Sequence, residues 1–113
     1  MCSKNTLQTV LHDLYTKLNE IYGSDLENVI LYGSYARGDY DDESDIDVIA
    51  LVKCDDNLIN KLRDDVISLI SELGVNYDVV LSVHVKNKVH FKRWKEHLPY
   101  YRNIVNEGVE ISA

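Results

Sequence analysis

Apolar positions along the chain repeat with helical spacing in some stretches and form short continuous runs in others. Four helices are predicted, over residues 5–22, 57–73, 87–98 and 99–108. Gly23 and Gly74 are natural ends for the first two, and Pro99 is well placed to begin the last. Ser3 or Asn5 could cap the first helix. These helices carry the core-facing positions and show no evident chemistry of their own.

Three strands are predicted between the helices, over residues 27–32, 45–52 and 75–85. The run Val29 to Leu31 is continuously apolar, which indicates burial on both faces of a sheet. The second strand opens with two acids and then becomes fully apolar, so the acids should lie at one end of the sheet. The third strand is interrupted by Asp78, an acid in an otherwise apolar stretch.

Asp45 and Asp47 are two residues apart at the start of the second strand. Strand side chains alternate between faces, so both carboxylates should point the same way. Neighbouring like charges repel, and burial makes the repulsion worse. A divalent cation removes this conflict, because carboxylate and phosphate oxygens are the ligands that Mg²⁺ prefers.

Gly33 and Ser34 follow the first strand directly, and we call this pair the glycine–serine elbow. A glycine lets backbone N–H groups approach phosphates without a Cβ in the way, and the serine adds a hydroxyl. Residues 33–38 are expected to form the turn and one short helical turn whose N-terminus favours anions. Together with the two acids, the elbow predicts a site for a metal-bound nucleoside triphosphate.

Asp78 needs a partner if it lies inside an apolar strand. It could pair with a lysine or cap a neighbouring loop. We favour a third possibility, in which Asp45, Asp47 and Asp78 share one cation site, because two carboxylates there already need a cation.

The size and composition suit one small globular domain over residues 1–113, with 45% apolar and 27% charged residues. No apolar run is long enough to span a membrane, and no secretory leader is evident. Cys2 and Cys54 lack the spacing of a metal site, which favours a reducing cytoplasmic setting. The net charge of −7 argues against direct nucleic-acid binding.

Charge is unevenly distributed. Residues 84–102 carry six of the 12 Lys and Arg but only one of the 19 acids, Glu96. This basic segment is either a solvated helix face or a surface that meets an acidic partner or nucleic acid.

The motif Gly33-Ser34, followed by Asp45-x-Asp47 and a later Asp78, resembles the polymerase-β-like nucleotidyltransferase superfamily. The fuller string Gly-Ser-x-Ala-Arg-Gly with Ser-Asp-Ile-Asp is similar to its smallest branch, the minimal nucleotidyltransferase (MNT) proteins, as is the ending at residues 101–111. The resemblance covers nearly the whole chain. It implies an α/β (α+β) fold, a small mixed β-sheet with helices packed on it.

The resemblance also implies a function. MNT proteins are typically encoded beside a HEPN-domain ribonuclease toxin, which they neutralise as antitoxins, in some systems by transferring AMP from ATP to a tyrosine of the toxin. The chain shows no further acceptor-binding domain, so the acceptor would come from the partner protein. The expected activity is a pyrophosphate-releasing protein adenylyltransferase.

Each site residue then acquires an expected role. Asp45, Asp47 and Asp78 would hold two Mg²⁺ ions roughly 4 Å apart, and Asp78 could help to deprotonate the acceptor. Gly33 and Ser34 would bind the β- and γ-phosphates, although Ser34 could merely cap the turn. Arg37 could pair with a phosphate or with the acidic loop at residues 39–43.

Two other functions are compatible with the sequence. The domain could neutralise its toxin by steric binding, with the basic segment, Tyr100 and Tyr101 as the contact surface. Transfer to a small molecule or RNA is disfavoured by the short length and the acidity. Self-modification of the eight tyrosines is also disfavoured, since Tyr15, Tyr22, Tyr32 and Tyr77 occupy positions suited to the edge of the core.

Overall fold

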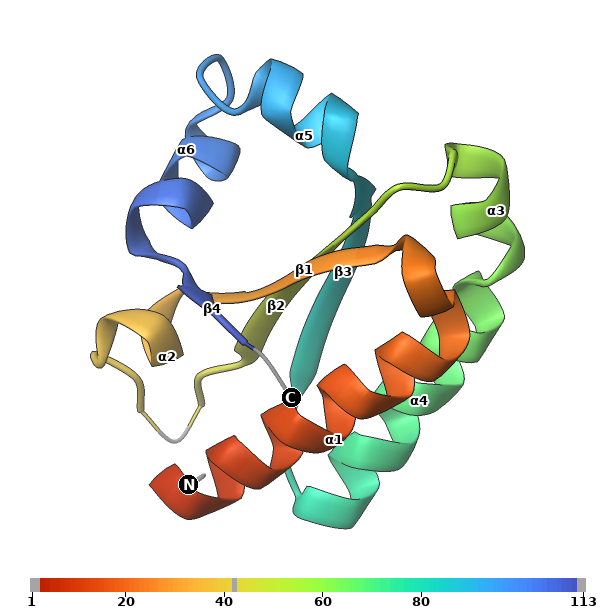
Figure 1. Cartoon of the computed structure of the whole chain (residues 1–113). Helices are drawn as coiled ribbons and strands as arrows, with labels where there is room; N and C mark the ends of the chain where they lie inside the picture. Colours follow the sequence, from red (N-terminus) through yellow and green to blue (C-terminus); the bar gives the residue numbers. More distant parts are fainter. Residues whose placement is uncertain (1–2, 42, 112–113) are drawn as a thin grey trace.

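The computed structural model describes residues 3–41 and 43–111. A four-stranded sheet separates two layers of helices (Figure 1). The elements are α1 (Lys4–Tyr22), a 3₁₀ turn η1 (Gly23–Asp25), β1 (Leu26–Tyr32), α2 (Ser34–Arg37), β2 (Ile46–Val52), α3 (Asp56–Lys61), α4 (Arg63–Tyr77), β3 (Leu81–Asn87), α5 (Lys88–Trp94), α6 (Pro99–Glu107) and β4 (Val109–Glu110). The expected mixed sheet covered by helices is confirmed.

The strands are arranged in the order β3-β2-β1-β4. β1 pairs antiparallel with both β2 and β4, whereas β2 and β3 run parallel, joined by the crossover through α3 and α4. The parallel register places the beginnings of β2 and β3 at the same edge of the sheet, with Ile46 opposite Leu81 and Asp47 opposite Ser82. This edge is where the predicted acids lie.

The main core lies between the sheet and α1 with α4 (Figure 1). Val48, which is fully buried on β2, and Leu14 and Leu18 of α1 are typical members. A smaller cluster lies on the opposite face, where Ile49 packs beneath α5 and α6. The two faces follow the alternation of β2, so Asp47 lies on the same face as Ile49. We call this the acid face.

The first half of the chain matches the sequence prediction closely. The helix predicted over residues 5–22 is α1, and Ser3 caps it by accepting a hydrogen bond from the Thr6 amide at 3.1 Å. The strands predicted over 27–32 and 45–52 are β1 and β2, each shifted at its start by one residue. Asp55 caps α3 through the Leu58 amide.

The single helix predicted over 57–73 is wrong, because the structure contains two helices that meet at Leu62. α4 also continues past Gly74 to Tyr77, and the chain is helical where the third strand was expected to begin. One side-chain contact and one backbone conformation explain the extension. The Tyr77 hydroxyl donates a hydrogen bond to Asp13 of α1, and Asp78 ends the helix in the left-handed conformation with φ +53°.

The helices of the acid face also differ from expectation. α5 ends at Trp94 rather than continuing to residue 98, and Phe91 is its buried side chain. Val89 and Trp94 are 64% and 41% exposed. α6 begins at Pro99 as predicted and buries Tyr101 and Ile104, whereas Val105 is exposed.

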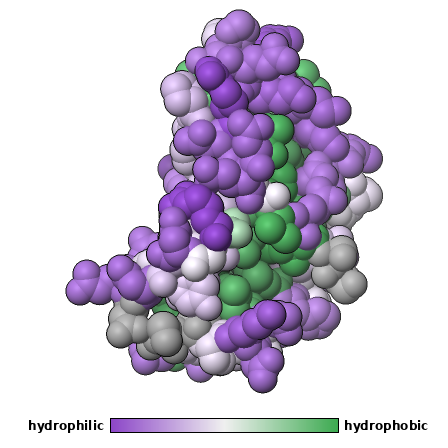
Figure 2. Space-filling model, turned by 90° about the vertical axis from the view of Figure 1, so that its left-hand side faces the viewer, coloured by the Kyte–Doolittle hydropathy of each residue, from purple (hydrophilic) through white to green (hydrophobic). Residues whose placement is uncertain are grey.

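The side of the molecule that carries α2 and α6 is mainly hydrophilic, with a hydrophobic strip exposed through its lower part (Figure 2). None of the helices within the described ranges is both long and apolar enough to cross a membrane.

Candidate functional site

The glycine–serine elbow and the two acids meet at one edge of the sheet. β1 ends at Tyr32, which lies opposite Asp47 in the antiparallel register. Gly33 therefore follows directly beside the acid pair, and Ser34 begins the short helix α2. Asp45 is exposed just before β2, and Asp47 is half-buried on the acid face. The predicted proximity of the elbow and the acids is present.

Gly33 and the Asp47 carboxylate are in close contact. Gly33 has φ +73° and ψ −155°, a conformation that is essentially restricted to glycine. A Cβ built on Gly33 would lie 2.4 Å from Oδ2 of Asp47. The carboxylate thus occupies the space that any other residue would fill, which explains why the turn has glycine at this position.

The electrostatic environment of Asp47 favours a bound cation. Burial raises the pKa of Asp47, and the neighbouring Asp45 raises it further, while His84 and Arg37 partly oppose the shift. Ionised Asp47 is therefore less stable here than in water. A divalent cation between the two carboxylates would reverse this penalty, so this pair of residues fits Mg²⁺ chemically.

Arg37 adopts the alternative in which it pairs with the acidic loop. Its Nε donates to Oδ2 of Asp39 at 3.1 Å, and a terminal guanidinium nitrogen donates to Oε2 of Glu107 at 3.1 Å. Both bonds raise the pKa of Arg37 above its usual value. Because all three side chains are partly exposed, these ion pairs are weak enough to exchange for a phosphate.

Asp78 does not join the acid pair, and its predicted placement within a strand is wrong. It is the exposed C-cap of α4, three residues before β3 begins. Within residues 3–41 and 43–111, no three His, Cys, Asp or Glu side chains are placed to hold one metal ion. The β3 side chains on the acid face are instead Ser82 and His84, opposite Asp47 and Ile49.

A cavity of about 340 Å³ lies beside the elbow. Its lining includes the predicted Gly33, Ser34, Arg37 and Asp47. The remaining lining residues are Tyr32, Tyr100, Asn103 and Glu107. The three from α6 were not identified from the sequence as site residues. Their spacing of three and four places them on one helix face, a pattern that was visible but could not be assigned to this cavity.

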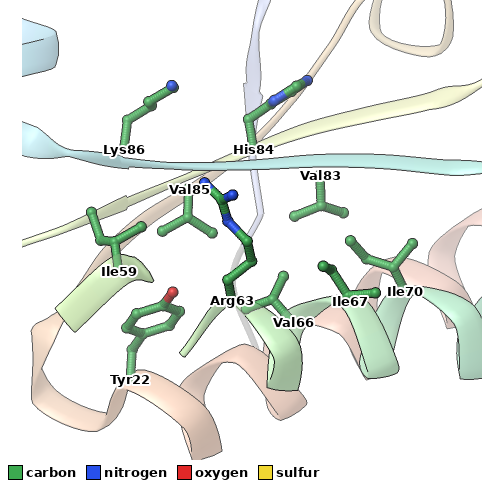
Figure 3. Close-up of a pocket in the computed structure, with 10 residues that line it drawn as sticks. All are labelled: Tyr22, Ile59, Arg63, Val66, Ile67, Ile70, Val83, His84, Val85 and Lys86. Atoms are coloured by element: carbon green, nitrogen blue, oxygen red, sulfur yellow. The ribbon is translucent and has the colours of Figure 1, made fainter. Parts of the chain in front are cut away.

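A second cavity of about 260 Å³ lies on the other face of the sheet, between β3 and the helices α3 and α4. Val83 and Val85 point into it, whereas His84 and Lys86 point away (Figure 3). Its lining is mostly aliphatic and contains no acid. The chemistry of a metal-bound triphosphate therefore fits the cavity at the elbow and not this one.

Tyr22 in the second cavity offers a stability test. Its buried hydroxyl has no hydrogen-bond partner among residues 3–41 and 43–111, and burial raises the pKa of Tyr22 to about 12. Below about pH 10 the Tyr22 hydroxyl keeps its proton in both the folded and the unfolded chain. Between about pH 10 and 12 the unfolded chain loses it first, so stability falls. We expect Tyr22→Phe to remove part of that fall and to leave stability at pH 7 unchanged or slightly higher.

Urea unfolding between pH 7 and 12 measures this effect, with Tyr15→Phe as the control. Identical pH dependence in the wild type and Tyr22→Phe, or a marked loss of stability at pH 7, would contradict the interpretation of the Tyr22 hydroxyl.

Known proteins resemble this chain in sequence. The profile of the family described as Nucleotidyltransferase domain matches residues 12–110. Two proteins of Methanocaldococcus jannaschii, both provisionally named protein adenylyltransferase, are similar in sequence. One is 33% identical over 101 residues, covering 89% of this chain and 93% of that protein. The other is 38% identical over 79 residues, covering 70% and 78%.

Solved structures share the fold at lower identity. A chain from a toxin–antitoxin crystal structure with AMP-PNP has a TM-score of 0.53 and 17% identity, covering 91% of this chain and 70% of that one. A chain from a mutant MntA–HpeT toxin–antitoxin structure has a TM-score of 0.51 and 19% identity, covering 100% and 74%. The family profile spans most of the sequence, and a relative above 30% identity is covered almost end to end. The chain therefore belongs to the nucleotidyltransferase domain family.

Proposed function

We propose that this nucleotidyltransferase moves AMP from ATP to a tyrosine hydroxyl of a partner HEPN ribonuclease and so acts as its antitoxin. The observation that carries the proposal is the contact between Asp47 and Gly33, which both line the 340 Å³ cavity. This contact places a carboxylate suited to a cation beside a backbone suited to phosphate. The relatives named protein adenylyltransferase support AMP transfer to a protein. Because the proposed reaction consumes ATP, we expect it to take place in the cytoplasm.

The chain's own residues have distinct parts in this reaction. Asp45 and Asp47 would hold Mg²⁺, as one ion or the predicted two, and bound Mg²⁺ supplies charge neutralisation at the transferring phosphate. The Gly33 backbone and the Ser34 hydroxyl would bind the β- and γ-phosphates. Arg37 would leave Asp39 or Glu107 to contact a phosphate oxygen. Tyr32 and α6 cover the other side of the cavity.

The partner assignment rests on the MNT resemblance and on fold neighbours from toxin–antitoxin structures. The test is a transfer assay with the purified chain, the HEPN protein encoded beside it, Mg²⁺ and ATP labelled in the α-phosphate. Label on a partner tyrosine, dependent on Mg²⁺, is expected. A partner in which the labelled tyrosine is changed to phenylalanine is the control. A toxin that is neutralised by the wild-type chain without any label would overturn the enzymatic proposal.

Steric neutralisation is the second candidate. It is favoured by the exposed cations of α5, Lys92 and Arg93, for which the structure shows no ion pair within the described ranges. Tyr101 cannot belong to such a contact surface, because its side chain is buried on the inner face of α6. If Lys92→Ala with Arg93→Ala lost neutralisation but kept AMP transfer, binding through the basic segment would be the dominant activity.

Glu107 competes with nucleotide for Arg37. We expect Glu107→Gln to tighten the binding of a non-hydrolysable ATP analogue with Mg²⁺ by about two- to fivefold, since an exposed ion pair is worth that much. Titration calorimetry at low ionic strength measures the change, and Glu110→Gln is a control with the same loss of charge. Weaker binding by Glu107→Gln would show that Glu107 itself contacts the nucleotide complex.

Asp78→Asn decides whether Asp78 joins the site when substrate binds. Asparagine tolerates the left-handed conformation, so the substitution should preserve the fold. We expect transfer to remain within about threefold of wild type, because Asp78 caps α4 outside the acid pair. A loss of about 100-fold in the transfer assay would contradict this placement and restore the three-carboxylate site.

A further inference from the structure

Tyr100 lies across the acid face at the site itself. Its hydroxyl is hydrogen-bonded to that of Tyr32 on β1. Its ring meets the Tyr32 ring edge-on at a centroid distance of 5.7 Å and the His84 ring of β3 at 6.4 Å. β2 lies between these two strands and carries Asp47. Tyr100 therefore spans the strand that bears the half-buried acid.

The two ends of α6 contact different parts of the cavity. Glu107, near the C-terminal end, pairs with Arg37 beside the elbow, where the phosphates would bind. Tyr100, near the N-terminal end, contacts Tyr32 and His84. Seven residues of helix separate Tyr100 from Glu107, which is about 10 Å. Both line the same cavity as Asp47, so the cavity presents a phosphate-binding end and a hydroxyl-bearing end.

Tyr100 is also the more accessible member of the tyrosine pair. It is 43% exposed, whereas Tyr32 is half-buried. The hydrogen bond between the two hydroxyls, in which either can donate, holds Tyr100 beside Tyr32. Tyr100 itself lines the cavity together with Asp47. Tyr32 is a positioning residue in this arrangement.

We propose that Tyr100 is a site of self-adenylylation by the chain's own nucleotidyl-transfer centre. This inference rests on the proposed function, which supplies ATP and the metal-dependent centre. The Tyr100 oxygen forms a bond to the α-phosphorus of ATP. The bond from that phosphorus to the oxygen bridging to the β-phosphate breaks, pyrophosphate leaves, and the phenolic proton passes to water in the open cavity.

The modification has a direct consequence for turnover. AMP attached to Tyr100 occupies the cavity that the next ATP would enter, so the modified chain is inactive. A partner tyrosine must take the same position relative to Asp47, which means that a docked partner displaces Tyr100 from it. The chain without its partner inactivates itself, and the chain with its partner modifies the partner.

The test incubates the purified full chain alone with ATP and Mg²⁺ and follows its intact mass, with peptide mapping of any product. One AMP on Tyr100 is expected, at a rate per molecule that does not depend on protein concentration. Tyr100→Phe should lose this product at least about tenfold, Asp47→Asn should lose it as well, and Tyr15→Phe on α1 should keep it.

The outcomes separate this inference from the proposed function. If the wild-type chain labels its HEPN partner but never labels itself, self-adenylylation is overturned and the proposed function stands. If neither protein is labelled and ATP is not consumed, the proposed function fails and this inference fails with it. Label that persists in Tyr100→Phe, on another tyrosine, also overturns the assignment.

Discussion

Replacing Asp45 and Asp47 together with asparagine should reduce AMP transfer by at least about 10³-fold and should make the metal-free protein more stable. The first effect follows from losing both carboxylates that are proposed to hold the cation, which would stabilise charge in the transition state. Asparagine has nearly the same shape, so it can occupy the space beside Gly33. The transfer assay with labelled ATP measures the loss.

The second effect follows from the pKa of Asp47. The folded state raises this pKa above its unfolded value, mainly through burial and then through Asp45. Such a group contributes most to stability below the unfolded pKa, and the contribution is lost as pH rises through the folded pKa. At pH 7 the ionised pair therefore destabilises the free protein, and asparagine removes this penalty.

Thermal unfolding with and without Mg²⁺ tests both parts. Mg²⁺ should raise the Tm of the wild type and leave that of the double variant unchanged. A matched control is Asp64→Asn with Asp65→Asn on α4, which removes the same charge far from the elbow. Transfer at the wild-type rate by the Asp45 and Asp47 variant, or equal stabilisation of both proteins by Mg²⁺, would refute the metal site.

Gly33→Ala should reduce transfer by about 100-fold and destabilise the fold by about 2–4 kcal/mol. The backbone conformation itself costs an alanine about 1–3 kcal/mol. The new methyl group would also lie 2.4 Å from Oδ2 of Asp47, so either the elbow or the carboxylate must move. A shift of about 1 Å in a catalytic carboxylate can reduce turnover by about 100-fold.

Gly23→Ala separates the effect of backbone strain from the effect of the clash with Asp47. Gly23 has a similar conformation, with φ +56° and ψ −131°, but a Cβ there meets no atom within 4 Å. We expect Gly23→Ala to lose stability through backbone strain alone and to keep its specific activity. Transfer by Gly33→Ala at the rate of Gly23→Ala, measured below both melting temperatures, would show that the contact with Asp47 is not important.

The sequence was informative where local pattern and tertiary structure agree. The continuous apolar run from Val29 to Leu31 and the acid-then-apolar order after Asp45 predicted β1, β2 and the edge at which the site lies. α1 was equally clear from its periodicity and its serine cap. In each case the burial that the pattern implies is the burial that the fold provides.

The errors arose where tertiary contacts override local preference. The apolar residues from Val75 onward favour a strand, and Gly74 resembles a helix end. The contact of Tyr77 with Asp13 on α1 and the left-handed Asp78 instead extend α4. This extension moved Asp78 out of the strand and left the acid pair without its expected third carboxylate.

The contribution of α6 could not be predicted for a different reason. The contact of Arg37 with Glu107 and that of Tyr32 with Tyr100 join residues about 70 positions apart. Periodicity identifies the inner face of a helix but not the part of the sheet that the face covers. The contacts of α6 with Tyr32 and Arg37 are what locate it beside Asp47.

The thin cover of the acid face has a consequence for dynamics. The layer of α5 and α6 buries Phe91, Tyr101 and Ile104, whereas the opposite layer of α1 and α4 contributes most of the main core. Local opening free energy scales with the apolar contacts broken. The amides of α6 should therefore exchange with deuterated solvent well before those of α1. The α6 side of the cavity at the elbow then opens more readily than the main core, and it can open while the rest of the sheet remains closed.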